Sequence, residues 1–228
     1  MSLHLHGVVR ALHRLPDGSP FRMVALEDLA VVVSDRPDGL ALTEQEAVAQ
    51  LAALCALLPG GPVLPLRIGT TAVDEAAART AVLALGPPAL RHHLDQLDGM
   101  AELHVRLVFD EDTALRAVYE KRAFTGRRTD TLAEGELIAR EIVAWRRKEA
   151  EALLAPVSAV ARSTALLPAP EHTVELRAYL LPLDQIEAVP AAVAAFTNVT
   201  ATCTGPLPAY NFLDLKQQQT RRSSRWGW

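Results

Sequence analysis

The sequence predicts an α+β protein of two small α/β-sandwich domains, spanning residues 1–99 and 100–228. Short runs that alternate between apolar and polar residues predict strands, and they are interleaved with longer runs whose apolar residues recur every three or four positions, as in helices. Half of the 228 residues are apolar but only 5% are aromatic, a composition that favours helices packed on a small amount of sheet. The length suits one large domain or two small ones.

The first domain is expected to combine strands with two helical crossovers. Thr43 followed by Glu46 is a capping-box pattern, which predicts a helix that continues to Leu58. Glu27 and Asp28 are the expected connection of a β-hairpin. The other expected elements are strands at 3–9, 21–26 and 29–34, a short strand and turn at 62–70, and a helical segment at 74–97 with a break at 86–88.

The second domain repeats this logic as strand, helix, strand, helix, strand. The expected strands are 101–109, 174–181 and 199–204, and the expected helices are 110–119, 132 to 154 or beyond, and 184–196. Pro156 is expected to kink or end the long helix. Because right-handed crossovers place the helices on one face of the sheet, the pattern predicts a ferredoxin-like unit.

Composition and charge exclude several classes of function. With 22% charged residues and a net charge of −4, the chain reads as a soluble globular protein with no reason to bind nucleic acid or an anionic membrane. No apolar run approaches the ~20 residues that span a bilayer. The two cysteines, Cys55 and Cys203, are isolated from each other and from metal-ligand spacings, which suits a reducing, cytoplasmic compartment.

No motif in the sequence indicates catalytic or cofactor-binding residues. His4 and His6 alternate on a strand and would share a face, as two metal ligands could, but no further ligand completes a recognisable spacing. Nucleophile-elbow, dinucleotide-binding and P-loop patterns do not occur. The charges of the long helix, Arg146 among them, are typical of a solvated face laced with salt bridges or of a partner-binding helix. We therefore expect no catalytic residue, metal or cofactor.

Arg67 is the most informative single charge, because its neighbours are apolar and the chain turns immediately after it, at Gly69. An arginine on a core strand needs a carboxylate, a carbonyl or a ligand as its partner. Arg67 is therefore interpreted either as one member of an internal ion pair that fixes the strand–loop junction, or as a contact to a ligand or partner.

A stiff segment near the C-terminus carries Gly205, Pro206, Pro208, Tyr210 and Phe212. Each proline fixes φ and lacks an N–H donor, so neither an ordinary helix nor a central strand fits. We expect an extended arm whose two aromatic residues point to the same face. The basic tail at 216–228 is expected to be frayed or, alternatively, to form a contact patch.

Two motifs together resemble a known family. Residues 62–70 read PVLPLRIGT and residues 205–212 read GPLPAYNF, which are similar to Pro-Val-Leu-Pro-x-Arg-Phe-Gly-Thr and Gly-Pro-Trp-Pro-Pro-Tyr-x-Phe of the gas vesicle protein F/L family. The opening strand with its Gly-Val-Val, the strand at 29–34 and a Gly-x-x-Glu stretch at 99–102 add support. The resemblance runs to about Phe212. Ile68, Leu207 and Ala209 depart from the family's usual Phe, Trp and Pro.

The resemblance implies a non-catalytic accessory or minor structural protein of gas vesicle assembly, an organelle that provides buoyancy. It implies two α+β domains, the second ferredoxin-like, and contacts with the main shell protein and other vesicle proteins. One alternative is an enzyme or small-ligand-binding protein on tandem ferredoxin-like domains, with a pocket around Arg67 and His104. RNA binding on the sheet is a weaker alternative, disfavoured by the net negative charge and the lack of aromatic RNA-binding patterns.

Overall fold

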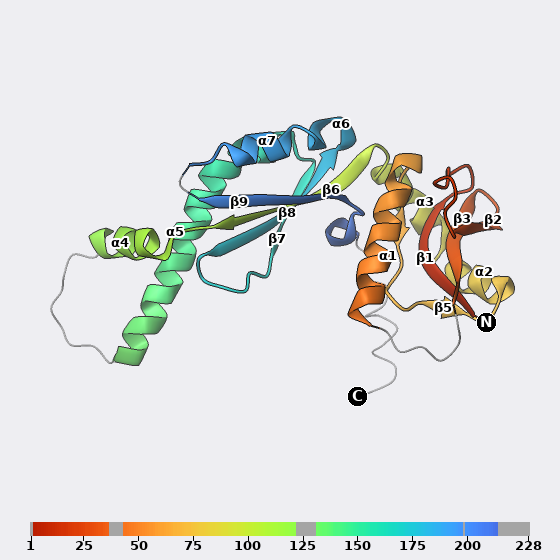
Figure 1. Ribbon diagram of the computed structural model, residues 1–228, viewed down its shortest axis with the longest axis horizontal. Helices are drawn as coiled ribbons and strands as arrows, with labels where there is room; N and C mark the ends of the chain where they lie inside the picture. The colour runs from red at the N-terminus through yellow and green to blue at the C-terminus, as the bar shows by residue number, and fades with distance from the viewer. Residues whose placement is uncertain (1, 37–42, 122–130, 198, 214–228) are drawn as a thin grey trace. The chain divides into compact units, whose positions relative to one another are not determined.

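The computed structural model describes residues 2–36, 43–121, 131–197 and 199–213 of the chain (Figure 1). The chain forms two compact units. Among the described residues, unit 1 comprises those up to Glu102 together with residues 206–213, and unit 2 comprises those from Leu103 to Gly205. The sequence had placed all residues from 100 onward in one domain, whereas the contacts group the segment that begins at Pro206 with unit 1. The basic tail at 216–228 lies outside the described residues.

Unit 1 is built on a five-stranded sheet in the order β2-β3-β1-β4, with β5 paired to β1. Its strands are β1 (Ser2–Arg10), β2 (Arg22–Leu26), β3 (Leu29–Arg36), β4 (Leu64–Pro65) and β5 (Thr71–Ala72). The predicted hairpin is confirmed, because β2 and β3 pair from Leu26↔Leu29 outward. Glu27 takes φ 55° to close this two-residue turn, a conformation that a non-glycine residue adopts at a cost.

Three helices complete unit 1: α1 (Glu44–Leu57), α2 (Glu75–Leu83) and α3 (Pro87–Gln96). The predicted capping box is confirmed, since the Thr43 hydroxyl accepts from the Glu46 amide and the Glu46 carboxylate accepts from the Thr43 amide. A 3₁₀ turn, η1 (Leu58–Gly60), ends α1. It runs close to the chain at His13, because a Cβ added to Gly60 would lie 2.8 Å from His13 Nε2 and collide with the Arg14 carbonyl.

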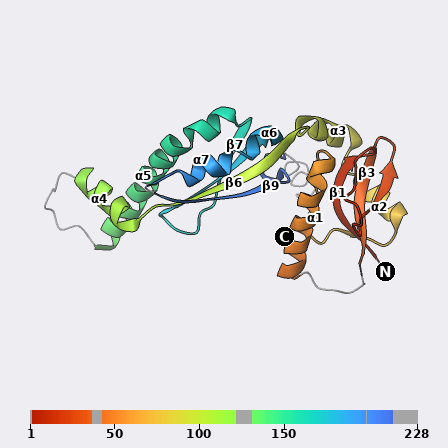
Figure 2. The same ribbon diagram turned by 45° about the horizontal axis from the view of Figure 1, so that its top comes forward.

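Both faces of the sheet of unit 1 are covered. Five consecutive residues of β3, from Leu29 to Val33, are buried, as in a strand with apolar layers on either side. Helix α1 lies on one side of the sheet and α2 on the other in both views (Figures 1 and 2). The expected sandwich is therefore formed.

Unit 2 is ferredoxin-like, as predicted. Its strands β6 (Met100–Val108), β7 (Ser163–Leu167), β8 (Val174–Pro182) and β9 (Thr200–Leu207) form a sheet in the order β7-β8-β6-β9. Read along the chain, the strands alternate with helices as βαββαβ. Strand β7 was not predicted from the sequence. It is an edge strand with three exposed residues, so it lacks the apolar alternation of a half-buried strand.

The helices of unit 2 are α4 (Glu111–Lys121), α5 (Thr131–Val160), α6 (Leu183–Ile186) and α7 (Val189–Ala194). Ala114, Val118 and Ile142 form a small buried cluster between α4 and α5. Pro156 lies within α5, which continues to Val160, so of the two expectations for this proline, a kink or an end, the end is excluded. Although α5 is 30 residues long, none of the described helices is apolar enough over a sufficient length to cross a membrane.

Candidate functional site

The first predicted site, around Arg67 and Gly69, is a tight turn at the surface of unit 1. The Arg67 carbonyl accepts hydrogen bonds from the amide and the hydroxyl of Thr70, at 3.0 and 2.6 Å. Gly69 has φ 82°, which the third position of a type II turn requires and which explains the glycine. Arg67 is exposed, and its side chain makes no ion pair with any described residue. The expected internal ion pair was therefore wrong.

The second predicted site is the C-terminal arm, residues 205–212, which begins at Gly205 with φ 152°. Pro206 is exposed, whereas Leu207, Pro208 and Ala209 are buried. Leu207, where the family has Trp, is 8% exposed and so keeps a packing role. The arm is a β-strand only up to Leu207, where β9 ends. Residues 210–212 then form a 3₁₀ turn, η2 (Tyr210–Phe212). The two aromatic residues are half-buried but do not lie on one face of an extended chain, as had been expected.

Glu102 of β6 anchors the arm within unit 1. Its carboxylate is 0% exposed and accepts two hydrogen bonds from Asn211: one from the backbone amide at 2.9 Å and one from Nδ2 at 2.5 Å. A buried carboxylate is tolerated only where donors compensate its lost hydration. Sequence reasoning missed this pair as a site, although Glu102 lies in the Gly-x-x-Glu stretch and Asn211 stands between the two aromatic residues of the last motif.

Tyr210 is held in the same neighbourhood. Burial, together with Cys55 and Glu102 nearby, raises the pKa of the Tyr210 hydroxyl to about 12. Burial also raises the pKa of the Cys55 thiol. Both groups are therefore protonated at neutral pH, so neither is an activated nucleophile.

The histidine pair of β1 lies inside unit 1. The His4 and His6 ring centroids are 4.6 Å apart, and the His6 Nε2 lies 2.9 Å from the Ser34 hydroxyl. Burial and the neighbouring His4 lower the pKa of His6 to about 4, and burial is also the main cause that lowers the pKa of His4. A search of the described residues finds no group of three or more side chains that could hold a metal ion.

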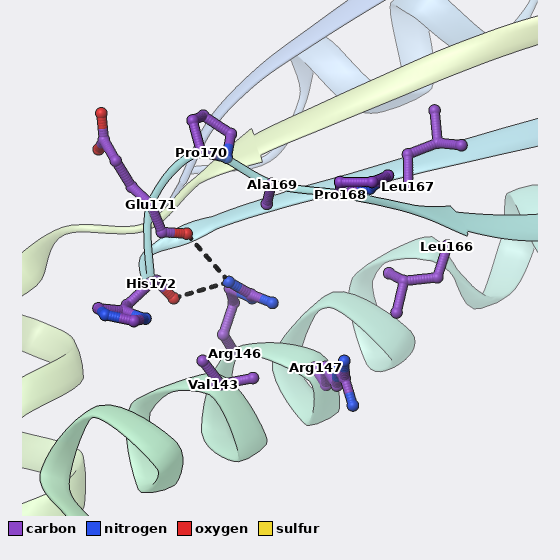
Figure 3. Close-up of a pocket in the computed structure, with 10 residues that line it drawn as sticks. All are labelled: Val143, Arg146, Arg147, Leu166, Leu167, Pro168, Ala169, Pro170, Glu171 and His172. Atoms are coloured by element: carbon purple, nitrogen blue, oxygen red, sulfur yellow. Dashed lines mark hydrogen bonds between the residues drawn. The ribbon is translucent and has the colours of Figure 1, made fainter. Parts of the chain in front are cut away.

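Unit 2 contains a buried ion-pair cluster that the sequence analysis did not foresee. Glu175 of β8 is 0% exposed and pairs with Arg146 Nε and with Arg177 Nη2, both at 2.9 Å. Arg146 is 5% exposed, and its Nη1 also donates to the carbonyls of Glu171 and His172 at 3.2 and 2.8 Å (Figure 3). Arg146 thus belongs to the interior, which corrects the interpretation of it as part of a solvated helix face.

Together these sites hold packing and anchoring groups. The thiols of Cys55 and Cys203 have raised pKa values through burial, and the buried histidines are neutral.

The fold defines a two-unit α+β protein whose second unit is ferredoxin-like. The sequence profile of the family described as "Gas vesicle synthesis protein GvpL/GvpF" matches residues 3–214. The chain therefore belongs to this family. A curated relative, "Gas vesicle protein F" of Streptomyces sp. (strain CB03234), is 28% identical over 244 residues, covering 94% of this chain and 100% of the relative.

Two solved structures share the fold. The crystal structure of gas vesicle protein GvpF from Microcystis aeruginosa matches with a TM-score of 0.74 at 16% identity, over 92% of this chain and 98% of that one. The crystal structure of GvpF from Anabaena sp. PCC7120 matches with a TM-score of 0.73 at 15% identity, over 92% and 97% of the two chains. At such identities the likeness concerns the fold alone.

Proposed function

We propose that this protein is a non-catalytic accessory protein of gas vesicle assembly that binds the main shell protein and other vesicle proteins. The observation that carries the proposal is the family match over residues 3–214, which includes both motifs, PVLPLRIGT and GPLPAYNF. The raised pKa values of the Cys55, Cys203 and Tyr210 side chains agree with it, because protonated groups lack the reactivity of a nucleophile or base.

In this proposal, the Arg67–Thr70 turn and the C-terminal arm stabilise unit 1, and partners contact the exposed surface. Gly69 supplies the positive φ of the turn, and Gly205 gives the freedom to enter the arm. Pro208 and the half-buried Tyr210 and Phe212 pack the arm down, while Pro206 and Arg67 stay exposed and are candidates for partner contact. The protein would work in the cytoplasm, at the gas vesicle, without nucleic acid, membrane or cofactor.

The test is a binding measurement between the purified full-length chain and its cognate shell protein, held soluble in mild detergent, by surface plasmon resonance. Saturable binding that Arg67→Glu weakens, and that the matched charge change Arg106→Glu on β6 leaves intact, supports the proposal. A lack of binding, together with normal vesicles in a strain that lacks the gene, would overturn it.

A further inference from the structure

A groove in unit 2 runs between α5 and the connection from β7 to β8. Its first part has a volume of about 340 Å³ and is lined by Val143, Arg146 and Arg147 of α5 and by residues 166–172 (Figure 3). A second hollow of about 520 Å³ adjoins it along α5, with Val143 and His172 common to both. The residues that line the two hollows all belong to unit 2.

The first part of the groove contains unused hydrogen-bond donors of a buried side chain. Arg146 Nε pairs with Glu175 and Nη1 donates to two carbonyls, but the two N–H groups of Nη2 donate to no described residue. Arg146 is only 5% exposed, but Nη2 is not one of the fully buried atoms that lack a hydrogen bond, so this end of the guanidinium remains accessible from the groove. A ligand in the groove can therefore accept hydrogen bonds from a charged donor, and such bonds are stronger than those between neutral groups.

The charge of the surrounding cluster points to an anion. Arg146 and Arg177 carry two positive charges against the single negative charge of Glu175, which leaves this ion-pair cluster with a net positive charge. The carboxylate of Glu171 points away from the Arg146 guanidinium in Figure 3. Arg147, exposed beside the groove, adds a further positive charge. The local charge is thus opposite in sign to the net charge of the chain, −4.

The remaining lining favours a peptide over a small anion. Val143, Leu166 and Pro168 give the first part apolar walls, and Leu166 is 49% exposed although it is a leucine. Along α5 the two hollows extend from Glu136 to Arg147, which corresponds to about 16 Å at the rise of an α-helix. An extended chain covers this length with about five residues.

We propose that this groove binds an extended peptide segment of a partner protein in which a carboxylate stands between apolar side chains. The carboxylate accepts from Arg146 Nη2 and from the Arg147 guanidinium, and the flanking apolar side chains lie on Val143 and Leu166. The proposal rests on the geometry and charge of unit 2, and it holds or fails separately from binding to the vesicle shell protein.

Fluorescence anisotropy with the full-length chain tests this site. The probe is a labelled seven-residue peptide with a central glutamate between leucines and polar ends, at about 0.15 M salt to suppress diffuse attraction. A second peptide carries glutamine in place of the glutamate. We expect saturable binding of the first peptide and binding at least about tenfold weaker for the second, because charge-assisted hydrogen bonds to guanidinium are the strong ones.

Three variants locate the binding. Arg147→Gln should weaken peptide binding about tenfold. The matched control Lys148→Gln lies on the same helix but outside the lining of the groove, and it should leave binding unchanged. Leu166→Glu should abolish binding. Circular dichroism checks that each variant is folded. If Leu166→Glu does not fold, the comparison of Arg147→Gln with Lys148→Gln still tests the site. The proposal is overturned by absent binding, by equal binding of both peptides, by equal losses in Arg147→Gln and Lys148→Gln, or by binding of inorganic phosphate as tight as that of the peptide.

Discussion

The anchor of the C-terminal arm gives the sharpest prediction about stability. Asn211→Ala deletes the 2.5 Å hydrogen bond from Nδ2 to a carboxylate that is 0% exposed, and leaves the backbone bond in place. A hydrogen bond to a charged group contributes roughly 1.5–3 kcal/mol. We therefore expect the free energy of arm opening to fall by about 2 kcal/mol. Asn211→Asp, nearly identical in shape, replaces the donor by a second carboxylate and should cost roughly 1–2 kcal/mol more at pH 7.

The reactivity of the Cys55 thiol reports this opening. Cys55 is half-buried and close enough to Tyr210 to affect its pKa, so release of the arm should expose it. In a Cys203→Ser background, where Cys55 is the only thiol, a loss of 2 kcal/mol should speed labelling by a disulfide reagent about 30-fold.

The pH dependence separates the two variants. As the pH falls from 7 towards 5, the aspartate introduced at position 211, which faces a second carboxylate, takes up a proton and can donate a hydrogen bond, so the deficit of Asn211→Asp should shrink. The deficit of Asn211→Ala should not, because it lacks this titrating group. Labelling rates that are equal in wild type and both variants would refute the anchoring role of Glu102.

Three further predictions concern the two cores. Gly60→Ala should destabilise unit 1 by about 1–3 kcal/mol, because the added methyl group would collide with the Arg14 carbonyl. Gly135→Ala, on α5 with open space around it, should stabilise unit 2 by up to about 1 kcal/mol. Urea unfolding measures the change in the free energy of unfolding for both variants. Glu175→Gln should cost unit 2 about 3–5 kcal/mol, because it removes the negative charge that pairs with the guanidinium groups of Arg146 and Arg177. If Arg147→Gln lowered the free energy of unfolding more than Glu175→Gln, this role of the cluster would be contradicted. Between pH 6.5 and about 4 the unfolded chain binds more protons at His6 than the folded chain does. The free energy of unfolding should therefore fall by roughly 2–3 kcal/mol as the pH is lowered through this range. The same pH dependence of the unfolding free energy in His6→Gln would contradict the assignment to His6.

The elements that were predicted correctly are those whose signals are local. Thr43 and Glu46 lie three residues apart and meet within one turn of helix, so their capping box could be read directly from the sequence. The β2–β3 hairpin was predicted because Glu27 and Asp28 separate two apolar runs, although neither residue is the glycine or asparagine that such turns favour. The alternation of strands and helices predicted the ferredoxin-like class of unit 2, although strand β7 was missed.

The parts that could not be predicted depend on contacts between distant segments. Glu102 and Asn211 are 109 residues apart, and nothing near either residue in the sequence indicates that they meet. Arg146 stands among charged residues on α5, and only the approach of β8 with Glu175 turns it into a buried group. Arg67 gave the opposite error, because its apolar neighbours suggested burial while the turn at Gly69 leaves the side chain exposed.

The most direct test of a role in gas vesicle assembly is the vesicle yield of a strain in which this gene is deleted and then restored. Flotation and electron microscopy of the cells measure the yield. The account predicts that deletion abolishes or strongly reduces vesicles, that the wild-type gene restores them, and that Gly135→Ala restores them equally while Asn211→Asp restores them less. Full flotation of the deletion strain, with vesicles of normal number and shape, would contradict it.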